Sequence, residues 1–114
     1  MKGFRAKGAE AERQAVAYLR GLGWKVLETN TRAWGAELDV IAQDGPTVVF
    51  LEVKARYSQR FGPPELALNE RKKQRMRQAA LRYLAQKAPE AAGRFDVILI
   101  GPQGLRHIRD AFEL

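Results

Sequence analysis

The sequence predicts one α/β domain of the mixed α+β type, in which helices flank a mixed β-sheet. Its 114 residues suit a single domain, and no repeat, low-complexity tract or linker divides them, so we expect the domain to span residues 1–114. A first helix is followed by three strand-like segments, a second helix and two further strands, which gives the order α-β-β-β-α-β-β. Hydrophobic residues make up 46% of the chain, which is enough to build a core.

The first helix is predicted over residues 8–22, because apolar residues such as Ala15 and Leu19 recur at helical spacing and a Gly-Leu-Gly segment ends the run. The first strand is predicted over residues 24–30, where apolar and polar residues partly alternate. A polar turn is expected at residues 29–34.

The second and third strands are predicted over residues 36–43 and 47–55, with an Asp-Gly-Pro turn at residues 44–46 between them. The third strand has the sequence TVVFLEVKA, a nearly continuous run of β-branched, aromatic and other apolar residues. Such runs are typical of strands that are buried on both faces, so we expect this strand to lie in the centre of the sheet.

The second half of the chain begins with a Gly-Pro-Pro loop at residues 58–64, followed by a long helix over residues 65–87. A strand is predicted over residues 95–100 and an edge strand over residues 105–110. The Gly-Pro-Gln-Gly segment at residues 101–104 predicts a hairpin turn between them.

The composition limits the possible chemistry. The chain carries 20 Lys and Arg against 13 Asp and Glu, a net charge of +7, which indicates a polyanionic partner such as nucleic acid, although basic surfaces also occur without that role. The absence of cysteine excludes disulfides, thiolate zinc sites and cysteine nucleophiles. A single histidine, His107, argues against a Ser-His-Asp triad or a His-rich metal site. A metal ion would therefore need oxygen ligands.

No apolar run approaches the roughly 18 residues that span a bilayer, and the N-terminal segment lacks the apolar stretch of a secretory signal. We therefore expect a cytoplasmic protein with no membrane partner.

Three charged residues interrupt the apolar pattern of the predicted strands. Asp39 lies within the second strand although aspartate is a poor strand former, so a capping or bulge role or a metal ion has to explain it. Glu52 and Lys54 share one face of the third strand, where a buried ion pair is the structural alternative to a functional site. If Asp39 and Glu52 faced each other at about 4 Å, their repulsion would be of order 4 kcal/mol at an effective dielectric near 20, and a divalent cation would relieve it.

The first helix adds Glu12 on the face that carries Ala15 and Leu19, so Glu12 is predicted to point toward the sheet unless it reaches solvent or an arginine. Carboxylates without histidine or thiolate suit a hard cation, and Mg²⁺ typically takes one or two carboxylates, waters and substrate phosphates. Lys54 beside such an ion would stabilise charge on a phosphorane or help to generate hydroxide. This combination indicates metal-dependent phosphodiester hydrolysis.

The same residues resemble known families. Asp39 followed by Glu52-Val53-Lys54, after a helix with Glu12, resembles the PD-(D/E)XK nuclease superfamily, and residues 7–13 are similar to the opening helix of archaeal Holliday-junction resolvases. Nearly the whole chain resembles the bacterial YraN family, which is assigned to that nuclease fold. The matching motifs are Gly8-x-x-x-Glu12, Asn30-x-Arg32, Gly35-Ala-Glu-Leu-Asp39, Phe50-Leu-Glu-Val-Lys54, Phe61-Gly62, Lys72 and Arg94-Phe-Asp-Val97.

This resemblance implies a restriction-endonuclease-like sandwich with a catalytic set of Glu12, Asp39, Glu52 and Lys54. Asp39, Glu52 and the Val53 carbonyl would bind Mg²⁺ or Mn²⁺, Glu12 would assist as a further candidate metal ligand, and Lys54 would position the water. The basic residues that we expect to contact nucleic acid are Lys7, Arg32, Arg56, Arg60, Lys72 and Arg75.

Other residues are expected to be structural. Asp96 is expected to pair with Arg94, and His107, on a predicted edge strand, is expected to be incidental. Some bases of the second helix are expected to be solvated. Three aromatic residues are expected to pack against other parts of the protein: Trp34, Tyr57 and Phe61. The alternative is that they stack on unpaired bases.

We therefore expect a Mg²⁺- or Mn²⁺-dependent endonuclease that acts on branched or structured DNA and recognises shape more than base sequence. A non-catalytic nucleic-acid-binding protein on the same fold is the main alternative, and an RNA-processing accessory factor is a third. A symmetric homodimer would supply two sites for paired incision at a two-fold junction.

Overall fold

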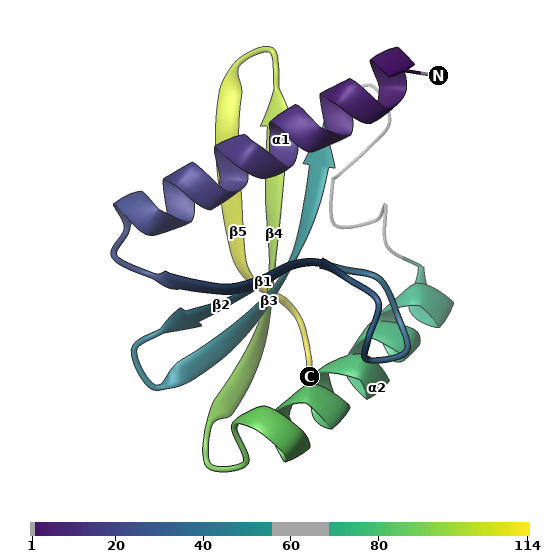
Figure 1. The fold of residues 1–114 in the computed structure, drawn as a ribbon, viewed down its shortest axis with the longest axis vertical. Coiled ribbons are helices and arrows are strands. Elements are labelled where there is room, and N and C mark those ends of the chain that lie inside the picture. Colours follow the sequence, from purple (N-terminus) through teal and green to yellow (C-terminus); the bar gives the residue numbers. More distant parts are fainter. Residues whose placement is uncertain (1, 56–68) are drawn as a thin grey trace.

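A computed structural model describes residues 2–55 and 69–114, with side chains from residue 8 onward. It confirms the predicted order of two helices and five strands (Figure 1). The elements are α1 (Lys2–Gly21), β1 (Lys25–Thr31), β2 (Leu38–Asp44), β3 (Thr47–Ala55), α2 (Glu70–Lys87), β4 (Ala92–Gly101) and β5 (Gly104–Phe112).

Both helices differ from their predicted starts. α1 begins at Lys2 rather than at residue 8, because the first turns lack the apolar repeat that marks a helix in the sequence. α2 begins at Glu70 rather than at residue 65, because Asn69 caps it: the Asn69 backbone is extended and its side chain accepts a hydrogen bond from the Lys72 amide. The loop predicted at residues 58–64 lies outside the described residues.

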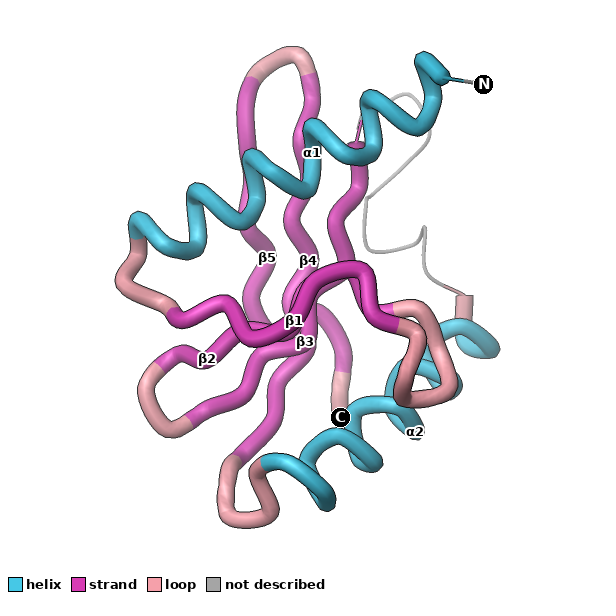
Figure 2. Tube along the Cα trace, viewed as in Figure 1, coloured by secondary structure: helices cyan, strands magenta, loops and turns pink. Residues whose placement is uncertain are grey.

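The five strands form one sheet in the order β1-β2-β3-β4-β5. β3 and β4 are parallel and are connected through α2, whereas the other neighbours are antiparallel, so the sheet is mixed as predicted. β3 is the central strand and β5 an edge strand, which confirms both predictions. Figure 2 shows the two helices on either side of the sheet. Neither of them is long and apolar enough to cross a membrane.

Two apolar clusters lie against the two faces of the sheet. Ala15 and Leu19 of α1 are fully buried in one cluster, beside Val49 and Leu51 of β3. Phe50 of β3 is fully buried in the other cluster, beneath α2. β3 thus contributes alternate residues to both clusters, and its burial on both faces explains its apolar sequence. Complete burial of each large side chain stabilises the fold by about 1.5–3 kcal/mol.

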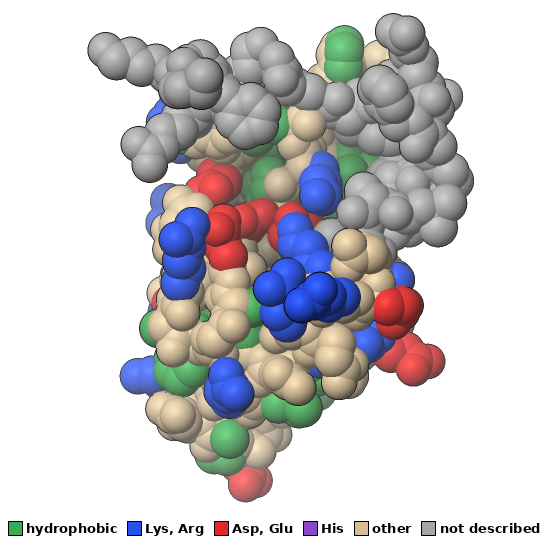
Figure 3. Space-filling view, turned by 90° about the vertical axis from the view of Figure 1, so that its right-hand side faces the viewer, with side chains coloured by type: hydrophobic (Ala, Val, Ile, Leu, Met, Phe, Trp, Pro, Cys, Tyr) green, Lys and Arg blue, Asp and Glu red, His purple; other side chains and the backbone are tan. Residues whose placement is uncertain are grey.

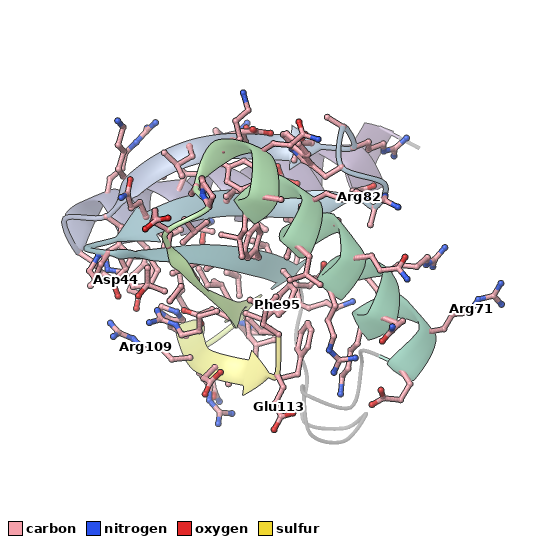
Figure 4. All side chains as sticks on the ribbon, turned by 90° about the horizontal axis from the view of Figure 1, so that it is seen from below. Asp44, Arg71, Arg82, Phe95, Arg109 and Glu113 are labelled. Atoms are coloured by element: carbon pink, nitrogen blue, oxygen red, sulfur yellow. The ribbon has the colours of Figure 1, made fainter. Side chains whose placement is uncertain are left out.

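The α2 side of the sheet is filled by aliphatic residues and four buried aromatic ones. Phe95 points into the space between the sheet and α2, whereas Arg71 projects outward from the helix, as Figure 4 shows. Arg71 is exposed, which confirms that some bases of this helix are solvated. Leu38 also packs in this cluster. Strict alternation along the strand predicted over residues 36–43 would place Leu38 on the opposite side with Val40. That expectation is wrong at the first residue of β2, where regular pairing with β3 has already ended.

A buried carboxylate joins β4 to β5 and α1. Asp96 accepts hydrogen bonds from the Arg94 guanidinium, from a His107 ring nitrogen and from the Asp110 amide. The pairing of Asp96 with Arg94 confirms the prediction, whereas the expectation that His107 is incidental is wrong. Tyr18 of α1 covers this part of the edge strand and its hydroxyl lies 2.8 Å from the other ring nitrogen of His107, so the ring is enclosed.

These contacts determine the charge state of Asp96. Burial alone would raise the pKa of Asp96, but the hydrogen bonds from His107, Arg94 and the Asp110 amide hold this pKa below its ordinary value of 3.8. The ionised carboxylate therefore stabilises the fold fully above pH 4. This stabilisation is lost as the pH falls through the lowered pKa of the folded state.

We predict that Asp96→Ala lowers the free energy of unfolding at pH 7 by about 3–5 kcal/mol, because it leaves buried charged and polar partners unpaired. Urea unfolding measures the change. Glu10→Ala is the control: Glu10 pairs with Arg13 on the surface of α1, and its loss is expected to change stability by less than about 1 kcal/mol. Equal losses in the two variants would contradict the structural role of Asp96.

Candidate active site

Asp39 lies where the pairing of β2 with β3 ends. The last bridged pair joins Val40 to Leu51, so continuation of the register places Asp39 opposite Glu52. One oxygen of Asp39 accepts a hydrogen bond of 2.8 Å from the Val53 amide. The Asp39 carboxylate thus replaces the backbone carbonyl that would accept a hydrogen bond from this amide if the ladder continued. This establishes a capping role for Asp39 at the end of the ladder.

Glu52 is a nearly buried carboxylate with two lysines beside it. Its side chain is 8% exposed, and its Oε2 lies 2.9 Å from the Lys72 ammonium and 3.7 Å from that of Lys54. The ion pair that we considered between Glu52 and Lys54 is therefore present, but the shorter contact comes from α2. The sequence points to Lys72 only as a phosphate contact, because the approach of α2 to β3 is a tertiary feature.

The acidic residues strongly affect one another. Burial raises the pKa of Asp39 to about 7, the charge of Glu52 adds to the effect, and the Val53 amide opposes it. Glu12 and Glu37 raise this pKa further. The direction agrees with the repulsion expected between Asp39 and Glu52. Four carboxylates from α1, β2, β3 and the segment before β2 therefore share one region.

Glu12 reaches this region from α1. Its carboxylate accepts a hydrogen bond from the Asn30 side chain, so it has an amide partner rather than an arginine. Burial raises the pKa of Glu12, the Asn30 bond opposes this, and Glu37 and Glu52 raise it further. Asn30 belongs to β1, so its contact with Glu12 confirms that this side chain is directed toward the sheet.

Asn30 is a positioning residue for Glu12, a role that the sequence alone does not predict. Its φ of 50° lies in the left-handed region, which asparagine tolerates better than most residues. The available signal was an asparagine at the junction of a strand and a polar turn, which is compatible with many turns. Its contact with a helix 18 residues earlier depends on the fold.

Three of these acids, Glu37, Asp39 and Glu52, line a pocket of about 360 Å³, whereas Glu12 is not among the residues that line it. Figure 3 shows acidic side chains gathered in a hollow, with basic side chains on both sides. The residues that line the pocket are Gly35, Ala36, Glu37, Asp39, Glu52, Lys72, Arg75 and Met76.

Three of the predicted nucleic-acid contacts lie near this pocket. Lys72 and Arg75 line it, and Arg32 is exposed and forms a 3.0 Å ion pair with Glu37, another lining residue. Predictions for Lys7, Arg56 and Arg60 fall outside the residues whose side chains are described.

Trp34 packs against other residues. Its ring lies edge-on to Tyr83 with 5.1 Å between centroids, and its indole N–H donates to Glu28. This confirms the packing prediction for Trp34. The predictions for Tyr57 and Phe61 lie outside the described residues.

The donor set fits a hard divalent cation with an incomplete protein shell. Within residues 8–55 and 69–114, no three His, Cys, Asp or Glu side chains are arranged to enclose a metal ion. Mg²⁺, however, usually takes only one or two carboxylates and completes its shell with water and phosphate oxygens. Asp39 and Glu52 supply two carboxylates whose mutual repulsion a cation would relieve. The Val53 amide faces Asp39, and in a strand the carbonyl of a residue points to the same side as its amide, so Val53 suits its predicted place.

We predict that Asp39→Asn abolishes part of the pH dependence of stability in metal-free protein. Between pH 4 and 7 the unfolded chain has an ionised Asp39 while the folded protein retains the proton, so wild-type stability falls as the pH rises through this range. The asparagine oxygen can still accept from the Val53 amide. Thermal melts from pH 4 to 8 in EDTA should show the melting temperature of the variant rising relative to that of wild type up to about pH 7. Parallel melting profiles would exclude the raised pKa.

Comparison with known proteins identifies relatives of the whole chain. The sequence profile described as "Uncharacterised protein family UPF0102" matches residues 11–100. A UPF0102 protein of Thermodesulfovibrio yellowstonii is 44% identical over 105 residues, covering 92% of this chain and 94% of the relative. A UPF0102 protein of Geobacter metallireducens is 46% identical over 112 residues, covering 94% and 92%. These matches confirm the family resemblance, and the chain belongs to the UPF0102 family, also called YraN.

Proposed function

We propose that this protein is a Mg²⁺- or Mn²⁺-dependent endonuclease that hydrolyses phosphodiester bonds, with branched or structured DNA as its substrate class. The observation that carries the proposal is the placement of Asp39 and Glu52 opposite each other at a pocket, with Lys54 beside Glu52. The resemblance of these residues to the nuclease motif supports the same assignment. The proposal places the protein in the cytoplasm with its substrate.

The proposed chemistry divides the work among the residues of the site. A cation held by Asp39, Glu52 and the Val53 carbonyl would supply Lewis-acid activation of the phosphate and of the attacking water. Lys54 extends from the same face of β3 as Glu52, where its ammonium would orient the water and stabilise negative charge on the phosphorane. Glu12, held by Asn30 and carrying a raised pKa, is suited to accept a proton from that water.

Binding would rely on the phosphate backbone. The net charge is +7, and the basic residues beside the pocket, Arg32, Lys72 and Arg75, come from two different parts of the chain. Contacts of this kind track charge and shape and do not read base edges. A symmetric homodimer would present two such sites to a four-way junction.

We predict that wild-type protein cleaves at least one substrate in a panel of duplex, single-stranded, flap, four-way-junction and RNA substrates when Mg²⁺ or Mn²⁺ is added. Lys54→Ala should cleave about 100-fold more slowly, because it lacks a preorganised charge at the reacting phosphate. Its affinity for nucleic acid should stay within several-fold of wild type, since one contact among many is lost. Gel assays measure cleavage and fluorescence anisotropy measures binding.

Each outcome of this panel favours one assignment. Binding without metal-dependent cleavage of any substrate would favour the non-catalytic alternative. Preferential binding and cleavage of RNA would favour the RNA-processing role. Full activity in a stably folded Lys54→Ala variant would exclude the proposed function of that lysine.

We also predict that affinity falls steeply with salt. A protein that neutralises about five phosphates shows a slope near −4.5 in a plot of log affinity against log salt concentration on duplex DNA. Arg75→Ala at the pocket should make this slope shallower by about 1. Arg106→Ala on β5, two strands away from β3, is the charge-matched control and should change the slope less. A flat salt titration for wild type would refute backbone-dominated binding.

A further inference from the structure

We propose that Lys72 is the resident counter-ion of the metal site: its ammonium neutralises Glu52 when no divalent cation is bound, and a cation has to displace it. This inference rests on the proposed function, because it concerns how the same carboxylate is used. It assigns to Lys72 a role in addition to the phosphate contact predicted from the sequence.

The contact of Lys72 with Glu52 is the more direct of two competing interactions. Both lysine ammoniums approach the same oxygen, Oε2, but Lys72 lies at hydrogen-bond distance, 2.9 Å, and Lys54 at 3.7 Å. The Glu52 side chain is nearly buried, so its charge needs a partner. Lys72 therefore provides most of the direct compensation for this carboxylate.

Apart from the contact with Glu52, the position of Lys72 at the start of α2 is electrostatically unfavourable for a positive charge. Lys72 is the third residue of the helix, and the N-terminal turn of a helix carries a partial positive charge that repels cations. Its amide is bound by the Asn69 side chain at 2.8 Å, so the backbone is fixed there. Arg71 and Lys73 share this turn, but of the three bases Lys72 is the one whose ammonium contacts Glu52, at 2.9 Å.

Competition follows from charge and geometry. A divalent cation and the Lys72 ammonium would share one carboxylate oxygen, and their like charges would repel at that distance. The Lys72 side chain is 37% exposed and lines the pocket, so it can move toward solvent without burying its charge. Lys54 lies farther from the oxygen and would remain beside the ion.

Titration of Mn²⁺ into metal-free protein tests the inference by calorimetry. Lys72→Met keeps the aliphatic stem and removes the competing charge, so it should bind Mn²⁺ about tenfold more tightly than wild type. Lys73→Met removes the same charge from the next position of α2, where the lysine lies near Glu70 instead, and should bind within about twofold of wild type. Lys72→Arg retains the charge and should bind no more tightly than wild type.

Thermal melting gives a second measurement that does not depend on cleavage. Without metal, Lys72→Met should melt below wild type, because Glu52 keeps only the longer contact with Lys54. Saturating Mn²⁺ should raise its melting temperature by more than it raises that of wild type. A loss of stability that Mn²⁺ does not restore would show that Lys72 is only a structural tie between α2 and β3, and would overturn the proposal.

Failure of this inference is distinguishable from failure of the proposed function. If Asp39→Asn abolishes Mn²⁺ binding but Lys72→Met binds no more tightly than wild type, the counter-ion role is wrong and the metal site stands. If Mn²⁺ binding is indifferent to Asp39→Asn, or is absent from both wild type and Lys72→Met, the metal site itself is wrong and both proposals fall.

Discussion

Glu52 places a negative charge on the strand that is covered on both faces, and the site is organised by the need to neutralise that charge. Phe50 and Leu51 immediately before it pack in the two apolar clusters, so the carboxylate begins where the core ends. Lys72 in the first turn of α2 forms an ion pair with Glu52, although a positive charge in that turn is unfavourable because it is repelled by the helix dipole. The central strand therefore determines both the layering of the fold and the location of its most strongly coupled charges.

Buried Asp96 and half-buried Asp39 have opposite electrostatic environments. Asp96 receives donors from Arg94, His107 and the Asp110 amide, and its pKa is lowered, as expected for a charge whose purpose is structural. Asp39 has the Val53 amide as its partner among the described residues, faces further acids, and has a pKa raised to about 7. With these partners the ionised Asp96 carboxylate stabilises the fold at neutral pH, whereas ionisation of Asp39 destabilises it. Perturbation by desolvation and like charge beside a pocket is a recognised mark of functional sites.

Local sequence patterns are sufficient to predict the layers of this fold and to single out two of its acidic residues. The apolar run of β3 predicts a central strand, and Asp39 and Glu52 are detectable because they violate the patterns of their strands. The contacts of Asn30, Lys72 and His107 are not predictable in this way, since each depends on elements far apart in the sequence. The face on which Leu38 lies is mispredicted for a related reason. Alternation applies only while β2 stays paired with β3, and that pairing ends at Val40.

The end of this pairing connects the fold to the proposed chemistry. Asp39 satisfies the Val53 amide after the backbone ladder has stopped, so the two strands can separate there without leaving that donor unpaired. Separation gives room for the pocket between β2, β3 and α2, and it exposes the edge of the carboxylate pair to that pocket. A neutral side chain such as asparagine would serve the cap equally well, without the repulsion from Glu52. An ionisable residue at a position that penalises charge is therefore the physical basis for proposing Asp39 as a cation ligand.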